Sequence, residues 1–390
     1  MIRSVLSYVG SFAGALTRPR PRALILAHAR GVSGEAGDRR AALRAALGYL
    51  LRAQQQGEDS GMGSYHLDHG WGASYPETTG YAIPTLLAAA DLLGVPAYRE
   101  AAIRAAEWLL TIQRADGGWQ GGRVGEGRSS VVFNTAQVVR GMLAAHAHTQ
   151  RAEFLEAALR AGGWMAAVQD ADGAWRGSNF MGVARVYDTY VDAPLLRLHG
   201  LTGSEALRSA ALRNLEWVLQ QRRTNGWFAN ADNTIKHNRR PITHTIAYTL
   251  DGLVECGVIT GDQRFLDAAR PAAHLLAERF LAEGRLNGRY DASWAGTEYP
   301  LMTGCAQLAI VWSRLDAILP DAGLREARSR MVTYLEKVQR LSDQGPAAIH
   351  GAMPGSFPLW GRYEKFAFPN WGTKYFADAL LCAEGHPPAH

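Results

Sequence analysis

The segment PETTGYAIPTLLAAADLLG, residues 76–94, has a Thr at position 79 followed by a nearly unbroken run of apolar and small residues. Such a run predicts a helix that is buried on most of its sides. Five later segments align with it on one Thr and continue in the same way. The aligned residues are Thr79, Thr135, Thr189, Thr245, Thr303 and Thr373. Each Thr is expected to cap its helix, since a Thr hydroxyl can accept a free backbone N–H of the first turn.

Helices of a second kind are predicted between these segments. AYREAAIRAAEWLLTIQ, residues 97–113, repeats Ala, Ile, Trp and Leu at steps of three and four, with Arg and Glu between them. That periodicity is typical of an amphipathic surface helix. Similar patterns cover residues 39–55, 97–113, 151–168, 204–221, 262–282 and 321–341. An outer helix and an inner helix therefore alternate six times, which predicts an all-α protein, an (α/α)6 toroid of six helical hairpins.

The connections predict where a site would lie. Short turns, such as GVPA at 94–97, lead from an inner helix to the next outer one, whereas long Gly- and Trp-rich loops lead back. All six inner-helix N-termini and all long loops are thus expected on one face, around a shared funnel. We expect residues 37–390 to form this single toroid domain, preceded by an N-terminal extension over 1–36.

The ends of three predicted outer helices carry a second repeat: QRADGGW at 113–119, QDADGAW at 169–175 and QRRTNGW at 221–227. The first two resemble the QxxDGxW motif of squalene cyclases and related α/α-toroid proteins. The resemblance implies that Gln and Trp tie outer helices together. The acidic DxDD motif of the cyclases is missing, because DTYVD at 188–192 has another spacing. The zinc ligands of protein prenyltransferases do not fall in place either.

The end of the chain carries another resemblance. HGAMPGSFPLWGRYEKFAFPNWGTKYFADALL, residues 350–381, resembles the C-terminal segment of α/α-toroid proteins encoded with bacterial exopolysaccharide biosynthesis genes. The stretches YPETTGY and YDTYVD extend the likeness over most of the chain. The resemblance implies a polysaccharide context, but no catalytic residue is carried over from it.

Two carboxyl groups lie at the predicted mouth of the funnel, where the inner helices begin. They favour glycoside hydrolysis, which needs one protonated and one ionised carboxyl. Glu77 lies just before the first inner helix, and Asp188 just before the third. We predict Glu77 as the general acid and Asp188 as the base or nucleophile. Asp192 follows one turn deeper, and Glu298 precedes the fifth inner helix. Both carboxyls can instead be partners of the helix N-termini.

The start of the fourth inner helix suggests a reaction other than hydrolysis. Its sequence, with the loop before it, is KHNRRPITHTIAY, residues 236–248. His244 and Tyr248 are four residues apart and therefore share a helix face. A lyase or epimerase that acts on uronic acids needs such a group to move a proton, with a cation or amide at the substrate carboxylate. Arg240 and Asn134 can supply the latter. The alternative is a His and a Tyr bonded to each other in the rim.

The loop 342–372 is rich in aromatic residues, whose faces can stack on sugar rings, and it has basic residues that can hold an acidic sugar. The same aromatic side chains can also simply fill the funnel. The full set of predicted substrate-binding residues is Trp71, Tyr75, Asn134, Gln137, Tyr187, Asp192, His237, Arg240, Glu298, Tyr299, Trp360, Arg362, Tyr363, Trp371 and Lys374.

Composition and charge narrow the possible partners, cofactors and location of the protein. The net charge of +5 modestly favours an acidic partner, but no Arg/Lys run indicates nucleic-acid binding. Three widely spaced cysteines predict buried thiols, and we expect no metal and no cofactor. No apolar run is long enough to span a membrane. Residues 5–16 imitate a signal peptide, yet the interruptions by Ser and Gly favour a cytoplasmic protein, with export as the alternative.

The sequence thus predicts a carbohydrate-active enzyme that cleaves or edits an acidic bacterial exopolysaccharide, with hydrolysis by Glu77 and Asp188 first. The alternatives are a lyase or uronyl epimerase, a polysaccharide-binding protein without catalysis, and a terpenoid-cyclase-like enzyme. The sequence leaves the oligomeric state open.

Overall fold

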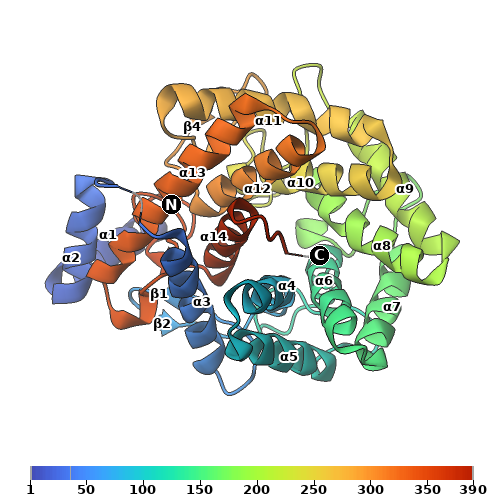
Figure 1. The fold of residues 1–390 in the computed structure, drawn as a ribbon, viewed down its shortest axis with the longest axis horizontal. Coiled ribbons are helices and arrows are strands. Elements are labelled where there is room, and N and C mark those ends of the chain that lie inside the picture. Colours follow the sequence, from blue (N-terminus) through green and yellow to red (C-terminus); the bar gives the residue numbers. More distant parts are fainter. Residues whose placement is uncertain (1, 36, 389–390) are drawn as a thin grey trace.

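Two concentric rings of helices make up most of the computed structural model, which describes residues 2–35 and 37–388 (Figure 1). The inner ring contains α4 (Pro76–Leu93), α6 (Val132–Thr149), α8 (Thr189–Thr202), α10 (Thr243–Thr260), α12 (Met302–Ile318) and α14 (Asn370–Ala383). The outer ring contains α3 (Arg39–Gln55), α5 (Pro96–Thr111), α7 (Ala152–Ala167), α9 (Glu205–Gln220), α11 (Gln263–Glu283) and α13 (Ala322–Leu341). The predicted (α/α)6 toroid is therefore confirmed.

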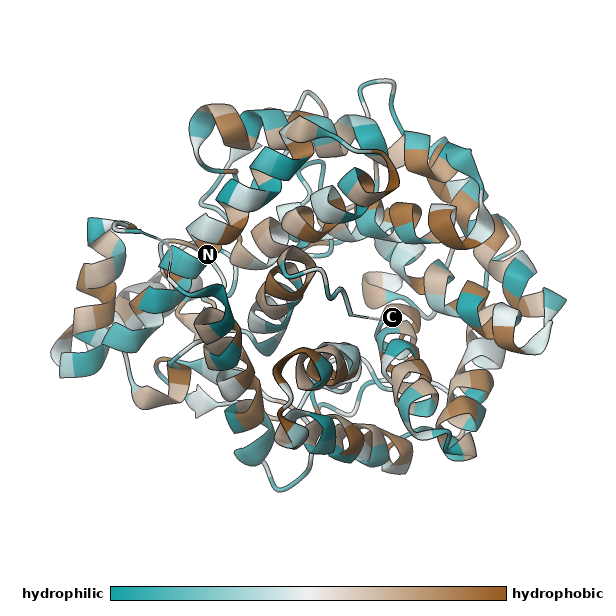
Figure 2. Cartoon of the chain, viewed as in Figure 1, coloured by the Kyte–Doolittle hydropathy of each residue, from teal (hydrophilic) through white to brown (hydrophobic). Residues whose placement is uncertain are grey.

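Hydropathy follows the two rings (Figure 2). Brown residues predominate in the inner helices α4 and α14, whereas teal and brown alternate along outer helices such as α5 and α9. In α4 all residues from Pro76 to Leu87 are buried. In α5 the buried residues recur at steps of three and four, as expected for a helix with one face on the core.

The long loops hold the remaining short elements. One small sheet pairs β1 (Tyr65–His66) with β2 (Gly70–Trp71) and with β5 (Ala367–Phe368), and a second pairs β3 (Arg289–Tyr290) with β4 (Gly296–Thr297). Single 3₁₀ turns are η1 (Phe180–Gly182), η2 (Val186–Asp188), η3 (Ser342–Gln344) and η4 (Ala347–Ile349). The sheet β2–β1–β5 joins the first loop to the last, so it helps to close the ring.

The N-terminal extension forms α1 (Ile2–Thr17) and α2 (Pro19–Arg30), which lie beside the ring (Figure 1). Phe12 packs edge-on against Trp360 and Phe366, with ring centroids 5.8 and 6.0 Å apart. Arg18 donates to the carbonyl of Leu67 at 2.8 Å. The extension thus supports the loop before α4 and the loop before α14. The boundary predicted at residue 36, and the range ends at 1 and 390, lie outside the described residues.

The aligned threonines do not cap their helices, so that prediction is wrong. The helix α4 begins at Pro76 with Tyr75 as N-cap, which places Thr79 inside the first turn. The Thr79 hydroxyl accepts from the backbone N–H of Met62 at 2.9 Å, and Thr135 accepts in the same way from Trp119. Thr373 accepts from Met353 at 3.0 Å. In these three repeats the Thr therefore fastens the preceding loop to its inner helix, whereas Thr189 donates to the Thr249 carbonyl of α10 and Thr245 to the Ile242 carbonyl.

The QxxDGxW segments tie neighbouring outer helices together, as their resemblance implies. The Gln113 amide donates to the carbonyls of Gly117 and Ala157, each at 2.8 Å, and so joins the end of α5 to α7. Gln169 repeats this bond pair between α7 and α9, with the Gly173 and Ala210 carbonyls. The third segment differs, because the Gln221 amide donates to Trp217 on its own helix.

Two glutamines outside the motif make equivalent bonds between other outer helices. Gln54 donates to the carbonyls of Ser60 and Ala101, which joins α3 to α5. Gln339 donates to the carbonyls of Ala42 and Gly351, which joins α13 to α3. The latter bond closes the toroid between its last and first outer helices.

Inner helices α4 and α6 touch backbone to backbone at two glycines. A Cβ on Gly80 would lie 2.6 Å from the Val138 Cα, and a Cβ on Gly141 would lie 2.4 Å from the Gly80 carbonyl oxygen. Backbone atoms cannot move aside as a flexible side chain can. We expect Gly80→Ala to lower the free energy of unfolding by about 1–3 kcal/mol, the usual cost of overpacking. Urea denaturation measures this, with Gly163→Ala as control, because nothing lies within 4 Å of a Cβ there. Equal stability of the two variants would contradict the close contact.

Ion pairs fill the deeper part of the inner ring. The fully buried Arg140 lies 2.8 Å from Glu255, which also pairs with Arg197 at 2.8 Å. Lys374 and Asp378 form a second buried pair at 2.7 Å. Arg140, Glu255 and Asp378 lie two or more turns below the N-termini of α6, α10 and α14, and Lys374 lies one turn below, so all four belong to the structure of the ring rather than to the cavity at its N-terminal face.

The cysteines and the hydropathy of the helices test two further expectations from the sequence. The thiols of Cys256, Cys305 and Cys382 are all unpaired; the first two are buried as predicted, and the third is half-buried. Within residues 2–35 and 37–388, no helix has the length and apolar character to cross a membrane.

Candidate functional site

A cavity of about 870 Å³ opens where the inner-helix N-termini meet the long loops. This is the position that the repeat predicts for a funnel. Its lining includes Tyr75, Glu77, Thr78, Tyr81, Arg123, Glu126, Arg128, Phe133, Asn134, Asn179, Tyr187, Thr234, His244, Tyr248, Arg362, Tyr363, Glu364 and Trp371. We call it the Glu77 cavity. Nine of the predicted site residues are among these, from α4, α6, α10, α14 and three loops.

Glu77 is positioned by the start of α4. Tyr75 is extended, and Pro76 fixes the first helical residue, so Glu77 lies in the first turn. Its Oε2 accepts from the Asn134 amide at 2.7 Å, and the same amide donates to the Tyr75 hydroxyl at 3.1 Å. Only 8% of Glu77 is exposed. Burial raises the pKa of Glu77 to about 7, although the bonds with Tyr75 and Asn134 act against the rise. A substantial fraction is therefore protonated at neutral pH.

His244 enters the same cavity from the first turn of α10. Its Nδ1 lies 2.7 Å from Oε1 of Gln307. With that carbonyl as acceptor, Nδ1 carries the proton and Nε2 keeps a lone pair. Burial lowers the pKa of His244 to about 4, against the bond to Gln307. The imidazole is thus neutral at physiological pH. Its ring lies 4.5 Å from that of Tyr248, by centroids, so the two predicted partners do meet.

Aromatic side chains form much of the cavity wall. The Phe133 ring is edge-on to Tyr187 at 5.0 Å and to Tyr248 at 5.1 Å. The Trp371 indole donates to the Tyr363 hydroxyl at 2.9 Å. These contacts hold the rings in fixed orientations, which suits stacking against the apolar faces of a sugar.

Asp188 does not line the cavity. The loop before α8 covers it, and Asn179 of that loop donates to Asp188 Oδ2 at 2.6 Å. Asp188 is fully buried, and burial raises its pKa well above the usual range. A fully covered carboxyl cannot contact a substrate in the cavity, so the predicted role of Asp188 as base or nucleophile is wrong. Asp192 is also fully buried, with its pKa raised by burial and by Asp188, and its predicted substrate contact is wrong too.

Four more predicted binding residues lie elsewhere. Gln137 and Lys374 are fully buried one turn below the mouth, and Lys374 is neutralised by Asp378. Trp71 stacks on Tyr49 at 5.4 Å beside the N-terminal helices. His237 is exposed on the loop before α10. It lines neither the Glu77 cavity nor the cavity of about 1320 Å³ that adjoins it. The structure therefore does not place these four side chains where they would contact a substrate in the Glu77 cavity.

Residues that the sequence did not single out complete the cavity. Glu364 is a half-buried carboxyl from the loop before α14; burial raises its pKa, and Arg123 opposes the rise. Arg123, Glu126 and Arg128 come from the Gly-rich loop after α5, with Glu126 and Arg128 paired at 2.8 Å. The only sequence signal for Glu364 was its place in the cluster RYEK, residues 362–365.

A second cavity, of about 1320 Å³, adjoins the first. Thr234 and Arg362 line both. Arg240, Glu298, Tyr299 and Trp360, all predicted to bind substrate, line this second cavity instead of the first. Its other residues include Asn238, Arg285, Asn287, Arg289, Thr297 and Lys365.

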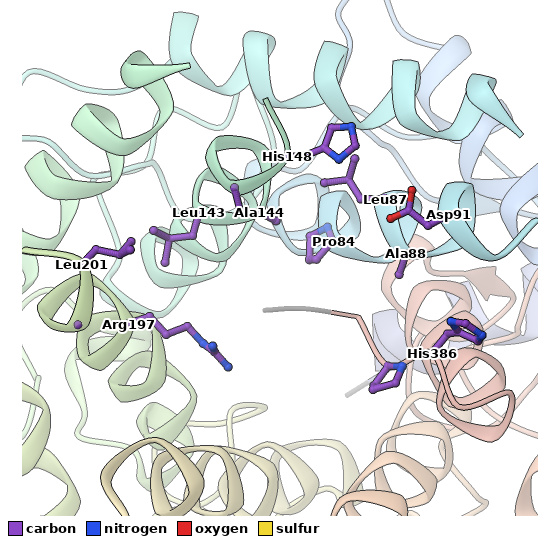
Figure 3. A pocket seen from close by; sticks show the side chains of 13 residues that line it. Pro84, Leu87, Ala88, Asp91, Leu143, Ala144, His148, Arg197, Leu201 and His386 are labelled. Carbon is purple, nitrogen blue, oxygen red and sulfur yellow. The ribbon is translucent and has the colours of Figure 1, made fainter. Parts of the chain in front are cut away.

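A third cavity, of about 650 Å³, lies at the other end of the ring (Figure 3). It is lined by the C-terminal halves of α4, α6 and α8 and by His386 and Pro387 after α14. Leu87, Leu143 and Leu201 make it largely apolar. It lacks the buried acid and the tyrosines of the Glu77 cavity. Among the described residues, no group of three or more His, Cys, Asp or Glu is arranged to hold a metal ion.

Comparison with known proteins finds likeness at the level of fold. No family model and no curated protein matches the chain. An unsaturated glucuronyl hydrolase specific for heparin superposes with a TM-score of 0.68 at 16% identity, over 90% of this chain and 98% of that one. The unsaturated glucuronyl hydrolase of Bacillus sp. GL1 gives 0.66 at 17% identity, over 88% and 97%. The cellobiose 2-epimerase of Bacillus thermoamylovorans gives 0.69 at 14% identity, over 88% and 99%. At such identities the likeness establishes the toroid.

Proposed function

We propose that this protein is a carbohydrate-active enzyme that hydrolyses a glycosidic bond in an acidic saccharide. The observation that carries the proposal is Glu77, a carboxyl with a pKa of about 7 that Asn134 holds inside an aromatic cavity. Arg123, Arg128 and Arg362 line the same cavity, which suits a substrate carboxylate. Similarity to unsaturated glucuronyl hydrolases supports the substrate class.

In this mechanism Glu77 donates its proton to the oxygen of the leaving group as the bond from that oxygen to the sugar carbon breaks. Glu364 is the candidate base, since it is the other carboxyl of the cavity that no arginine within bonding distance neutralises among the described ion pairs. It takes a proton from a water molecule, whose oxygen bonds to the sugar carbon. The protons balance, because one leaves Glu77 and one reaches Glu364.

The pH dependence follows from the same carboxyl. The acid must be protonated and the base ionised, so we expect a bell-shaped kcat/KM profile whose alkaline side falls as the pH rises through the pKa of Glu77, about 7. Reducing-end release from an acidic oligosaccharide, measured across pH, checks this. A flat profile from pH 6 to 9 would contradict the role of Glu77 as acid.

His244 favours a second function, proton abstraction by a lyase or a uronyl epimerase. Its neutral ring, with Nε2 as the free lone pair, suits removal of a proton next to a carboxylate, and Asn134 and Tyr248 line the same cavity. The likeness to cellobiose 2-epimerases supports it. Incubation with acidic polysaccharides separates the two. Reducing ends without ultraviolet absorbance support hydrolysis, both signals support elimination, and deuterium uptake from heavy water without cleavage supports epimerisation.

A bacterial exopolysaccharide as substrate and a cytoplasmic location, with export as the alternative, both rest on the sequence. A polysaccharide-binding protein without catalysis is the outcome if saturable binding occurs with no product. The polar groups of the Glu77 cavity do not suit a terpenoid cyclase, which needs a closed apolar cavity.

A further inference from the structure

We propose that the second cavity binds the anionic sugar units that follow the one held beside Glu77, so that the preferred substrate is a polyanionic chain rather than a single disaccharide. We call this cavity the basic groove, defined by Arg240, Arg285, Arg289, Arg362 and Lys365. The inference rests on the proposed function, because it names the substrate class of the same site.

The charge of the basic groove supports an anionic occupant. Five cationic side chains line it, against one carboxylate, Glu298. Glu298 lies 3.2 Å from Arg289 and 3.4 Å from Arg362, so it is already shared between two arginines. Arg240 lies 3.6 Å from Asp291, and Arg289 also pairs with Asp232. The Arg362 and Arg240 side chains stay 78% and 53% exposed. Five cations against these three carboxylates leave an excess of positive charge that faces solvent.

The groove is held in place by buried polar contacts. The fully buried Asp232 accepts from the Thr234 hydroxyl at 2.7 Å and from the Asn238 amide at 3.1 Å. Arg289 reaches the same carboxylate at 2.9 Å and donates to the Arg240 carbonyl at 2.8 Å. The loop that carries Asn238 and Arg240 is thus fastened to the wall that carries Arg289, which preorganises the groove.

Neutral groups in the groove suit a sugar chain. Asn287 and Thr297 offer an amide and a hydroxyl for sugar hydroxyls, and Tyr299, which is 48% exposed, offers a ring face. Planar guanidinium groups bind carboxylates or sulfates through paired N–H donors. This mixture of cations, amides and aromatic rings matches an acidic oligosaccharide better than a simple ion.

The two cavities adjoin. Thr234 and Arg362 line both, so a chain that extends from the Glu77 cavity past these two side chains reaches the basic groove next. The groove alone, at about 1320 Å³, exceeds the roughly 300–1,000 Å³ of a typical small-molecule pocket. The two cavities together have room for several sugar units.

The test measures binding in the Glu77→Gln background, so that no ligand is consumed. Probes are a disaccharide and a decasaccharide of hyaluronan, of oligogalacturonate and of alginate, with maltodecaose as the neutral chain. For at least one acidic series we expect the decasaccharide to bind at least about ten-fold tighter than its disaccharide. Adding Arg240→Gln and Arg285→Gln is expected to remove most of that gain, about ten-fold, and to weaken its salt dependence. The matched control is Arg104→Gln with Arg330→Gln, two exposed arginines on the outer helices α5 and α13.

Three results would overturn the inference: no length dependence in any acidic series, equal affinity for maltodecaose, or an undiminished gain in the groove variant. The outcome for the proposed function is separate, since it is measured as product formation by the enzyme with Glu77 intact. Length-dependent binding without any product would reject hydrolysis and leave the basic groove standing. Product formation with no length effect would do the reverse.

Discussion

Glu77→Gln is expected to lower kcat by roughly 10²–10⁴-fold, the usual range for loss of a general acid or base, with a much smaller change in KM. The amide has nearly the shape of the carboxyl, and its oxygen can still accept from Asn134, as Glu77 does at 2.7 Å. What is lost is the proton that the leaving group needs. Removal of a buried, partly protonated carboxyl adds no unpaired charge, so the fold should persist.

The measurement is reducing-end release under saturating acidic oligosaccharide, with thermal unfolding measured in parallel. Glu107→Gln is the matched control, because Glu107 lies on the outer helix α5 with its side chain 47% exposed and pairs with Arg151 at the surface. Its kcat should equal that of the unmodified protein. If Glu77→Gln keeps more than about a tenth of kcat, Glu77 is not the acid, and the chemistry moves to His244.

The architecture was predictable because some of the residues that hold the toroid together recur in the sequence at regular intervals. Gln113 and Gln169 recur with DGxW, and their amides do join successive outer helices. Gln54 and Gln339 make the equivalent bonds without that motif, so the closure of the ring has no local sequence signal. The role of Thr79 was misread for a related reason. A Thr that caps a helix and a Thr that links the helix to the preceding loop occupy the same point of the sequence.

The site was predictable only in part, because depth within the funnel depends on the loops. Asn134, Asp188 and His244 occupy equivalent places before the aligned Thr, yet only Asn134 and His244 line the cavity. The loop that contains Asn179 folds over Asp188 and buries it. Nothing in the periodicity of α8 tells where that loop lies. Glu364 was missed for the converse reason, since it lies on a long loop with no repeat to align it.

The basic groove, too, could be predicted from the sequence only in part. Its cations come from the loop before α10, the turn after α11 and the loop before α14, at Arg240, Arg285 and Arg362. Segments so far apart in the sequence meet only because the toroid closes. Arg240 and Arg362 could be chosen from composition, but not the fact that both belong to a neighbouring cavity.

Glu255→Gln is expected to lower the free energy of unfolding by about 3–5 kcal/mol, as is usual when one partner of a buried ion pair is removed. Arg140 is fully buried and lies 2.8 Å from Glu255, and Arg197 shares the same carboxylate. An amide can accept a hydrogen bond but cannot balance the charge. Urea denaturation at pH 7 measures the loss. Glu205→Gln, an exposed site 70% accessible and paired with Arg208, should change stability by less than about 0.5 kcal/mol.

The pH dependence of stability supplies an independent check on the same group. Burial alone would raise the pKa of Glu255, but Arg140, Arg197 and Arg314 outweigh it and lower the pKa to about 2, from 4.5. A carboxyl with a depressed folded-state pKa stabilises the fold fully above its unfolded value, and the contribution is lost as the pH falls from 4.5 toward 2. Glu255→Gln should therefore flatten the stability curve in that window. A double variant with Arg140→Met separates charge from packing. If unpaired charge causes the loss, the double variant is less destabilised than the sum of the single variants, whereas simple additivity would attribute it to packing.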